Sequence, residues 1–86
     1  MLHKLKILSS FVRPILNGEK TFEIRENDRG FQNGDRVQFK VNPDDWTRRN
    51  SSPVYELEHK VFEITYVING WGLKNGFVAF GIREEA

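Results

Sequence analysis

Four Asn–Gly pairs divide this sequence and limit the lengths of the elements it can form. They stand at residues 17–18, 33–34, 69–70 and 75–76. Both residue types accept the left-handed backbone conformation that ends helices and closes tight turns. The stretches between the pairs alternate apolar and polar residues, so the pattern predicts several short strands.

The alternation predicts five or six strands and one short helix. The expected strands cover residues 3–8, 20–25, 37–41, one or two strands with a bend within 54–68, and 77–82. The helix is expected over residues 11–16, with Ser9 or Ser10 as its cap and Asn17 at its end. Residues 42–53 are polar, contain two prolines and are expected to form a loop. We therefore expect a mainly β (α+β) fold, a small antiparallel β-barrel with one helix near the N-terminus.

The composition predicts one domain with a single small core. The chain has 86 residues, of which 38% are hydrophobic and seven are Phe. Cysteine is absent, which excludes disulfides, thiolate metal sites and a cysteine nucleophile. No stretch approaches the roughly 20 apolar residues of a membrane span, and the alternating N-terminus lacks the apolar run of a secretory signal. We expect a soluble, cytoplasmic protein.

The charges are unevenly distributed along the chain. Residues 1–49 carry ten positive and seven negative side chains, a net charge of +3, whereas residues 50–86 carry three and five, a net charge of −2. This asymmetry is typical of a protein with one basic face. Scattered, solvated charge would give the same counts.

Residues 18–25 carry the side chains best suited to bind a ligand. They read Gly-x-Lys-x-x-Glu-x-Arg, directly after the helix stop. Lys20 is a compact cation that suits a phosphate, and Arg25 is a planar fork that suits a phosphate or a base edge. Glu23 shares a strand face with Arg25, while Lys20 joins them only if the chain twists or bulges after Gly18. A surface ion pair worth at most about 1 kcal/mol is the alternative.

Further basic and aromatic residues would extend such a surface. The candidates are Lys6, Arg29, Trp46, Arg48 and Arg49. Trp46 with the two arginines after it would form an arm that stacks on unpaired bases, or the tryptophan docks back on the domain. Trp71 lies between two glycines, where it either stacks on a ligand or plugs one end of the barrel.

No metal or cofactor is expected. His3 and His59 lie far apart in the sequence, and no Asp, Glu or His cluster has the spacing of metal ligands. His3 is expected at a strand end, where it would form a local hydrogen bond.

The order of these segments resembles the ASCH domain of the PUA-like superfamily. Its signature matches Gly18, Lys20, Glu23 and Arg25 position for position. The closer likeness is to small bacterial and phage proteins of unknown function, through His3–Lys6, Asn27–Arg29 and Gly34–Asp35. It covers nearly all of residues 1–86 as a single ASCH/PUA-like domain. The resemblance implies a PUA-like barrel with a cleft between helix and sheet, RNA binding, and a link by name to a transcription coactivator.

The residues and this resemblance together leave three functional hypotheses. The first is a module that binds RNA or a nucleotide-like ligand in a basic cleft beside the signature. The second is a small hydrolase, because a related ASCH branch removes acyl groups from modified cytidine with the signature lysine as base and a threonine as nucleophile. Here Glu23 occupies that threonine's place and Thr21 would point to the other side of the strand, so we expect no catalytic residue. The third is a protein-interaction domain, such as a phage-borne inhibitor that presents the Trp46 loop.

Overall fold

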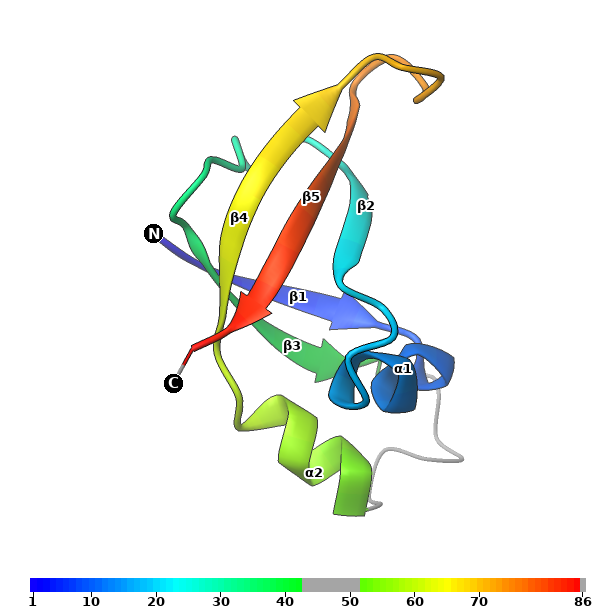
Figure 1. The fold of residues 1–86 in the computed structure, drawn as a ribbon, viewed down its shortest axis with the longest axis vertical. Helices are drawn as coiled ribbons and strands as arrows, with labels where there is room; N and C mark the ends of the chain where they lie inside the picture. The colour runs from blue at the N-terminus through cyan, green and yellow to red at the C-terminus, as the bar shows by residue number, and fades with distance from the viewer. Residues whose placement is uncertain (43–51, 86) are drawn as a thin grey trace.

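The fold is built on one curved sheet of five strands with helices at one end (Figure 1). A computed structural model describes residues 1–42 and 52–85. The strands are β1 (Leu2–Ile7), β2 (Phe22–Glu26), β3 (Arg36–Val41), β4 (Phe62–Asn69) and β5 (Phe77–Glu84), in the spatial order β1-β3-β4-β5-β2. The helices are the single turn η1 (Ser9–Phe11), α1 (Val12–Leu16) and α2 (Ser52–Glu58).

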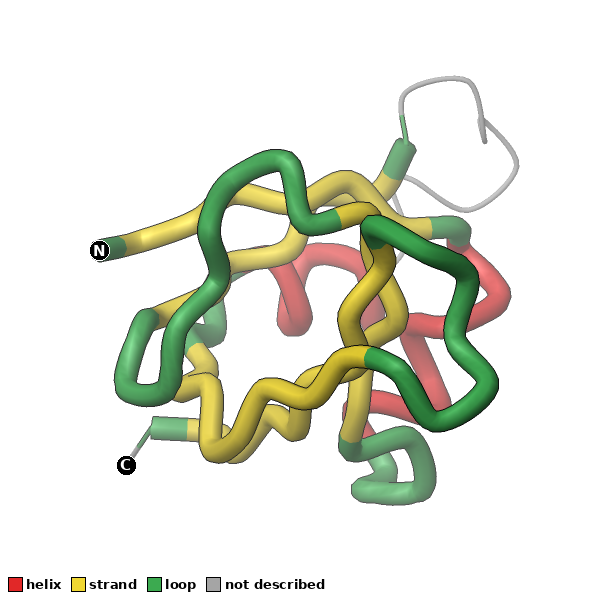
Figure 2. The backbone as a smooth tube through the Cα atoms, turned by 90° about the horizontal axis from the view of Figure 1, so that it is seen from above, coloured by secondary structure: helices red, strands yellow, loops and turns green. Residues whose placement is uncertain are grey.

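The prediction of a mainly β domain is confirmed, but the prediction of a closed antiparallel barrel is wrong. β1 pairs with β3 in parallel, which is possible because α1 and β2 lie between them in the chain. The other three pairings are antiparallel. The edge strands β1 and β2 do not pair, and the sheet curls around an open side (Figure 2).

Two arginine side chains bridge this open side in place of backbone pairing. Arg25 Nη2 on β2 donates to the carbonyl of Lys6 on β1 at 2.8 Å. Arg29 Nη1 donates to the carbonyl of Lys4 at 2.9 Å. Unpaired carbonyls make an edge strand prone to pairing with other chains. The two guanidinium groups therefore cover the outer edge of β1 and hold β2 beside it.

The prediction of strand over residues 54–58 is wrong, because these residues belong to α2. Val54 and Leu57 are buried three positions apart, the spacing of one helix face. Pro53 stands in the first turn, where its missing N–H costs least. The Glu58 carboxylate accepts from the backbone N–H of Val41 at 2.9 Å, which fixes the end of α2 against β3.

A bulge in β4 divides the face that alternation predicts for that strand. The expected face comprised Phe62, Ile64, Tyr66 and Ile68. The pairing register shifts between Ile64 and Tyr66, so the residues before it are buried and those after it are exposed. Gly81 lies opposite the bulge, and a Cβ there would collide with Oγ1 of Thr65.

The core consists of apolar side chains from β1, β3, β4 and β5, from α1 and α2, and from Phe31 in the loop before β3. Its buried members are Leu5, Ile7, Val12, Ile15, Phe31, Val37, Phe39, Val41, Val54, Leu57, Phe62, Ile64, Val78, Phe80 and Ile82. Phe31 packs between two other rings, with centroids 4.7 Å from His3 and 4.9 Å from Phe80.

His3 is buried, and its hydrogen bond is not local. Its Nε2 lies 2.8 Å from Oδ2 of Asp35, a residue 32 positions further along the chain. An ionised carboxylate only accepts hydrogen bonds, so Nε2 carries the hydrogen. This bond ties the start of β1 to the turn before β3, and the expectation of a local partner is wrong.

This contact makes stability depend on pH in the acid range. The hydrogen bond from His3, reinforced by the backbone N–H of Gln32, lowers the pKa of Asp35 from its ordinary value of 3.8. The ionised carboxylate therefore stabilises the fold above that value, and this stabilisation is lost as pH falls through the lowered pKa. Urea unfolding between about pH 5 and about pH 2 should show a steeper loss in the wild type than in Asp35→Asn. Parallel curves for the two proteins would contradict this role.

Candidate ligand-binding site

A buried carboxylate holds two cations together at the start of β2. Glu23 is only 3% exposed. Nζ of Lys20 donates to its carboxylate and, at 2.8 Å, to the carbonyl of Phe22. Nε and Nη2 of Arg25 lie 3.0 and 2.9 Å from Glu23 Oε1. We call Lys20, Glu23 and Arg25 the ion triad, and its net charge is +1.

The orientation of β2 places Glu23 and Arg25 of the triad on the inner face of the strand. Glu23 lies opposite Phe80 of β5 and points to the core side, while Phe22 and Ile24 point outward and are 48% and 53% exposed. Burying a carboxylate is costly unless it is paired and hydrogen-bonded. Glu23 meets this condition through its two cationic neighbours.

Lys20 reaches Glu23 although strict alternation would place them on opposite faces. β2 begins at Phe22, so Lys20 precedes the strand and its side chain is not bound by the alternation. Gly18 before it has a φ of +74°, which is favourable for glycine and directs the chain out of α1. The chain therefore makes the twist after Gly18 that Lys20 needs in order to join Glu23 and Arg25.

A solvent-open hollow of about 620 Å³ lies over the triad, between β1, β2 and the first helical turns. We call it the first hollow. Its charged lining includes Lys6 and all three triad residues, and its apolar lining includes Leu8, Phe11, Phe22 and Ile24. Nζ of Lys20 lies 4.6 Å from the ring centroid of Phe11 and 5.1 Å from that of Phe22. The site thus combines aromatic faces with partly exposed cations.

The residues predicted from the sequence do not all gather at this hollow. Lys6, Lys20, Glu23 and Arg25 do. Arg29 lines a smaller hollow of about 220 Å³ and is engaged with the Lys4 carbonyl. The predicted arm of Trp46, Arg48 and Arg49 lies outside the described residues.

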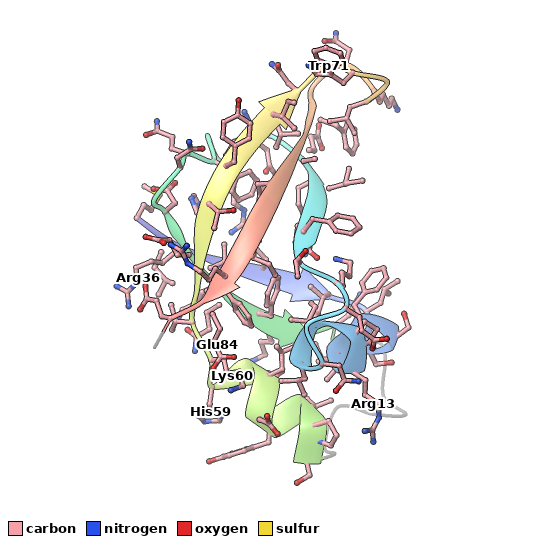
Figure 3. The ribbon with its side chains drawn as sticks, in the orientation of Figure 1. Arg13, Arg36, His59, Lys60, Trp71 and Glu84 are labelled. Atoms are coloured by element: carbon pink, nitrogen blue, oxygen red, sulfur yellow. The ribbon has the colours of Figure 1, made fainter. Side chains whose placement is uncertain are left out.

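Trp71 does not plug the sheet, contrary to one of its two predicted roles. It is 89% exposed at the tip of the β4–β5 hairpin, far from the helices (Figure 3). Its φ of +53° is left-handed, between Gly70 at +71° and Gly72 at +89°. A bulky residue adopts this conformation at a cost of roughly 1–2 kcal/mol. The loop therefore holds a tryptophan in water at the expense of stability.

Sequence reasoning missed the apolar lining of the first hollow. Phe11 begins the helix predicted over residues 11–16, and Leu8 ends the strand predicted over residues 3–8. Their exposed fractions are 37% and 51%. The sequence does contain a signal for this lining. Large apolar residues are dense on both sides of the Gly-x-Lys-x-x-Glu-x-Arg segment, and their number exceeds what the packing of one small helix and one strand requires.

Among residues 1–42 and 52–85, no group of three or more His, Cys, Asp or Glu side chains is arranged to hold a metal ion. None of the helices in the same residues is long and apolar enough to cross a bilayer.

The fold and the site together define the class of protein: a small α+β domain that has a mixed sheet and a hollow above a buried ion triad. The chain belongs to the DUF3850 family, a domain of unknown function, which it matches over residues 2–82. No curated protein matches the sequence.

Proposed function

We propose that this domain binds RNA, or a nucleotide-like ligand, in the first hollow. The observation that carries the proposal is the combination of exposed aromatic rings and basic groups around a space of about 620 Å³. Small-molecule sites typically have volumes of about 300–1,000 Å³, mostly apolar walls and a few polar groups that orient the ligand.

The chemistry of the lining suits a base with its phosphate. Phe22 is half exposed and offers a face on which a base can stack, since every base has a π-face. Lys6 is exposed at the rim and supplies a cation for the phosphate. Glu23 and Glu26 balance two of the three cations that line the hollow, Lys6, Lys20 and Arg25, so the lining keeps one net positive charge.

The proposal includes the finer assignment to the ASCH domains of the PUA-like superfamily. It rests on the match of Gly18, Lys20, Glu23 and Arg25 to their signature. The open side between β1 and β2 accounts for the difference from a closed barrel, because Arg25 and Arg29 bridge it through side chains.

The alternative hydrolase function would require Lys20 to act as a base. In this structure Nζ of Lys20 donates hydrogen bonds to the carboxylate of Glu23 and to the carbonyl of Phe22. A base needs a free lone pair within reach of the group it activates. This arrangement supports a binding role over the hydrolase.

Replacing Lys6 or Phe22 with alanine should weaken RNA binding without unfolding the domain. Both side chains are well exposed, and neither is a member of the triad. Phe22→Ala should lower the affinity about five- to hundredfold through lost stacking. Lys6→Ala should reduce the slope of log affinity against log salt by about 0.7, the contribution of one phosphate contact on a single strand. Fluorescence anisotropy of a labelled, unstructured RNA at several salt concentrations measures both effects.

Lys40→Ala is the matched control. Lys40 stands beside Lys6 in the β1–β3 register but lines a different hollow. Its substitution should leave the affinity and the salt slope close to those of the wild type.

Arg25→Ala should also weaken binding, but it removes the bridge to Lys6 and a partner of Glu23, so its effect includes a loss of stability. An affinity that is insensitive to salt, to Lys6→Ala and to Phe22→Ala would refute the site.

A further inference from the structure

The β4–β5 hairpin carries a second hollow of about 400 Å³. We call it the tip hollow. Its lining includes Asn27, Asn69, Lys74, Asn75, Gly76 and Phe77. Within residues 1–42 and 52–85, no protein group hydrogen-bonds to the side-chain amides of Asn69 and Asn75. Each amide has two donors and an acceptor, the groups needed to meet the edge of a base.

The tip hollow and the first hollow adjoin. Phe77 lines both of them. Glu26 at the end of β2 lines the first hollow, and Asn27, the next residue, lines the tip hollow. The backbone N–H of Asn27 donates to the carbonyl of Gly76 at 2.9 Å, so the end of β2 is fixed to the hairpin where the two hollows meet. The two hollows therefore form one track along the molecule.

Aromatic and cationic groups recur along this track. Phe22 lines the first hollow and Phe77 lines both hollows. The exposed Trp71 at the tip of the hairpin lines neither, but it directly follows Gly70, which lines the tip hollow (Figure 3). Lys74 beside the tip hollow adds a cation, and its Nζ lies 5.8 Å from the ring centroid of Phe77. Stacking rings alternating with cations are typical of surfaces that bind single strands, whose bases are free to splay outward.

We infer that the ligand is an unpaired strand of RNA that runs from the first hollow across Phe77 to the hairpin, where a base stacks on Trp71. This inference rests on the proposed function and extends it to a ligand class and a second contact point. A paired duplex keeps its bases stacked inside and cannot present them to three separated rings. The left-handed backbone of residues 70–72 holds the indole in solvent, where an incoming base can reach it.

The test uses Trp71 as its own reporter. The chain has two tryptophans, so Trp46→Phe leaves the emission of Trp71 alone. Uridine monophosphate should bind in the first hollow without changing that emission. An oligouridylate of about eight nucleotides should quench it and bind at least about tenfold more tightly than the mononucleotide. Trp71→Ala should lower the affinity for the oligomer about five- to hundredfold and leave that for the mononucleotide unchanged.

The control variant is Tyr66→Ala. Tyr66 is also an exposed aromatic residue of the same hairpin, at 61%. Unlike Trp71, which directly follows Gly70 of the tip hollow, neither Tyr66 nor its neighbours in the chain line either hollow, so its loss should change neither affinity. Oligomer binding without quenching, and with full affinity in Trp71→Ala, would overturn the inference while leaving the proposed function intact. Equal affinity for a duplex of the same length would also overturn it. Failure of both the mononucleotide and the oligomer to bind would overturn the proposed function itself.

Discussion

Glu23→Gln should lower the free energy of unfolding by about 3 kcal/mol, a large effect for a polar substitution that preserves side-chain shape. Glu23 is the shared partner of Lys20 and Arg25, which are themselves mostly buried, with 15% and 24% of their side chains exposed. A neutral amide leaves both cations without their counter-charge and turns an N–H₂ group toward them. Breaking a buried ion pair from one side costs about 3–5 kcal/mol, and the partial exposure of the cations places this case at the lower end. Urea denaturation followed by circular dichroism measures the change.

The adjacent Ile24→Ser provides the control for this prediction. Ile24 is 53% exposed on the outer face of β2, so its loss should cost about 1 kcal/mol or less. Adding Lys20→Met to Glu23→Gln should restore part of the lost stability, since one of the two unpaired charges is then removed. If Ile24→Ser destabilises the protein more than Glu23→Gln, the inner and outer faces of β2 have been assigned the wrong way round.

This pair of substitutions shows what alternation along a strand can and cannot establish. The alternation of β2 separates Glu23 and Arg25 from Phe22 and Ile24, and the structure keeps them on separate faces. The alternation alone does not predict which of the two faces points to the core. The inward face is the charged one because Lys20, from outside the strand, completes the pairing that makes a buried carboxylate tolerable.

The strands and turns near the Asn–Gly pairs were predictable because the local chemistry determines them. Gly34 has a φ of +87°, and Gly18 and Gly76 likewise adopt left-handed values where turns were expected. The helical conformation of α2 was not predictable from its short pattern. Val54 and Leu57 are its only buried residues, and such a short apolar spacing fits either a strand or a helix.

The parallel pairing and the open side of the sheet depend on contacts between distant residues. No local pattern predicts that β1 lies beside β3, or that Arg25 donates a hydrogen bond to the carbonyl of Lys6, 19 residues earlier in the chain. The bulge at Thr65 likewise reverses which residues of β4 face the core, although the residue pattern itself is uninterrupted. These features follow from packing and are visible only in three dimensions.

The candidate site was predictable in its charges and not in its apolar lining. The offsets of Lys20, Glu23 and Arg25 indicated one polar cluster, and the structure joins the three directly. Leu8 and Phe11 reach the same hollow because the chain turns through η1 directly after β1, a path that strand and helix patterns do not specify. The glycines on both sides of Trp71 are compatible with a stacking residue or with a plug, and its exposed side chain excludes the plug.

Phe80→Ala should lower the free energy of unfolding by about 4 kcal/mol, since truncating a buried phenylalanine typically costs about 3–5 kcal/mol. Phe80 is only 1% exposed, in the middle of β5. Its ring packs on Phe31, which in turn packs on His3, so the cavity would also loosen the contact that supports the His3–Asp35 hydrogen bond. A domain of this size has a total stability of roughly 4–13 kcal/mol, so the variant would be close to unfolding.

Phe22→Ala is the same chemical change on the neighbouring strand and isolates the effect of position. Phe22 pairs with Gly81, next to Phe80 in the β2–β5 register, but its ring faces outward and is 48% exposed. It should cost about 1 kcal/mol of stability, since half of its apolar area is already in water. The two variants should therefore separate two roles: Phe80→Ala loses a large part of the domain's stability, whereas Phe22→Ala keeps most of that stability and loses affinity for RNA. Equal destabilisation by both would mean that Phe22 belongs to the core, and the outward aromatic face on which the first hollow depends would not exist.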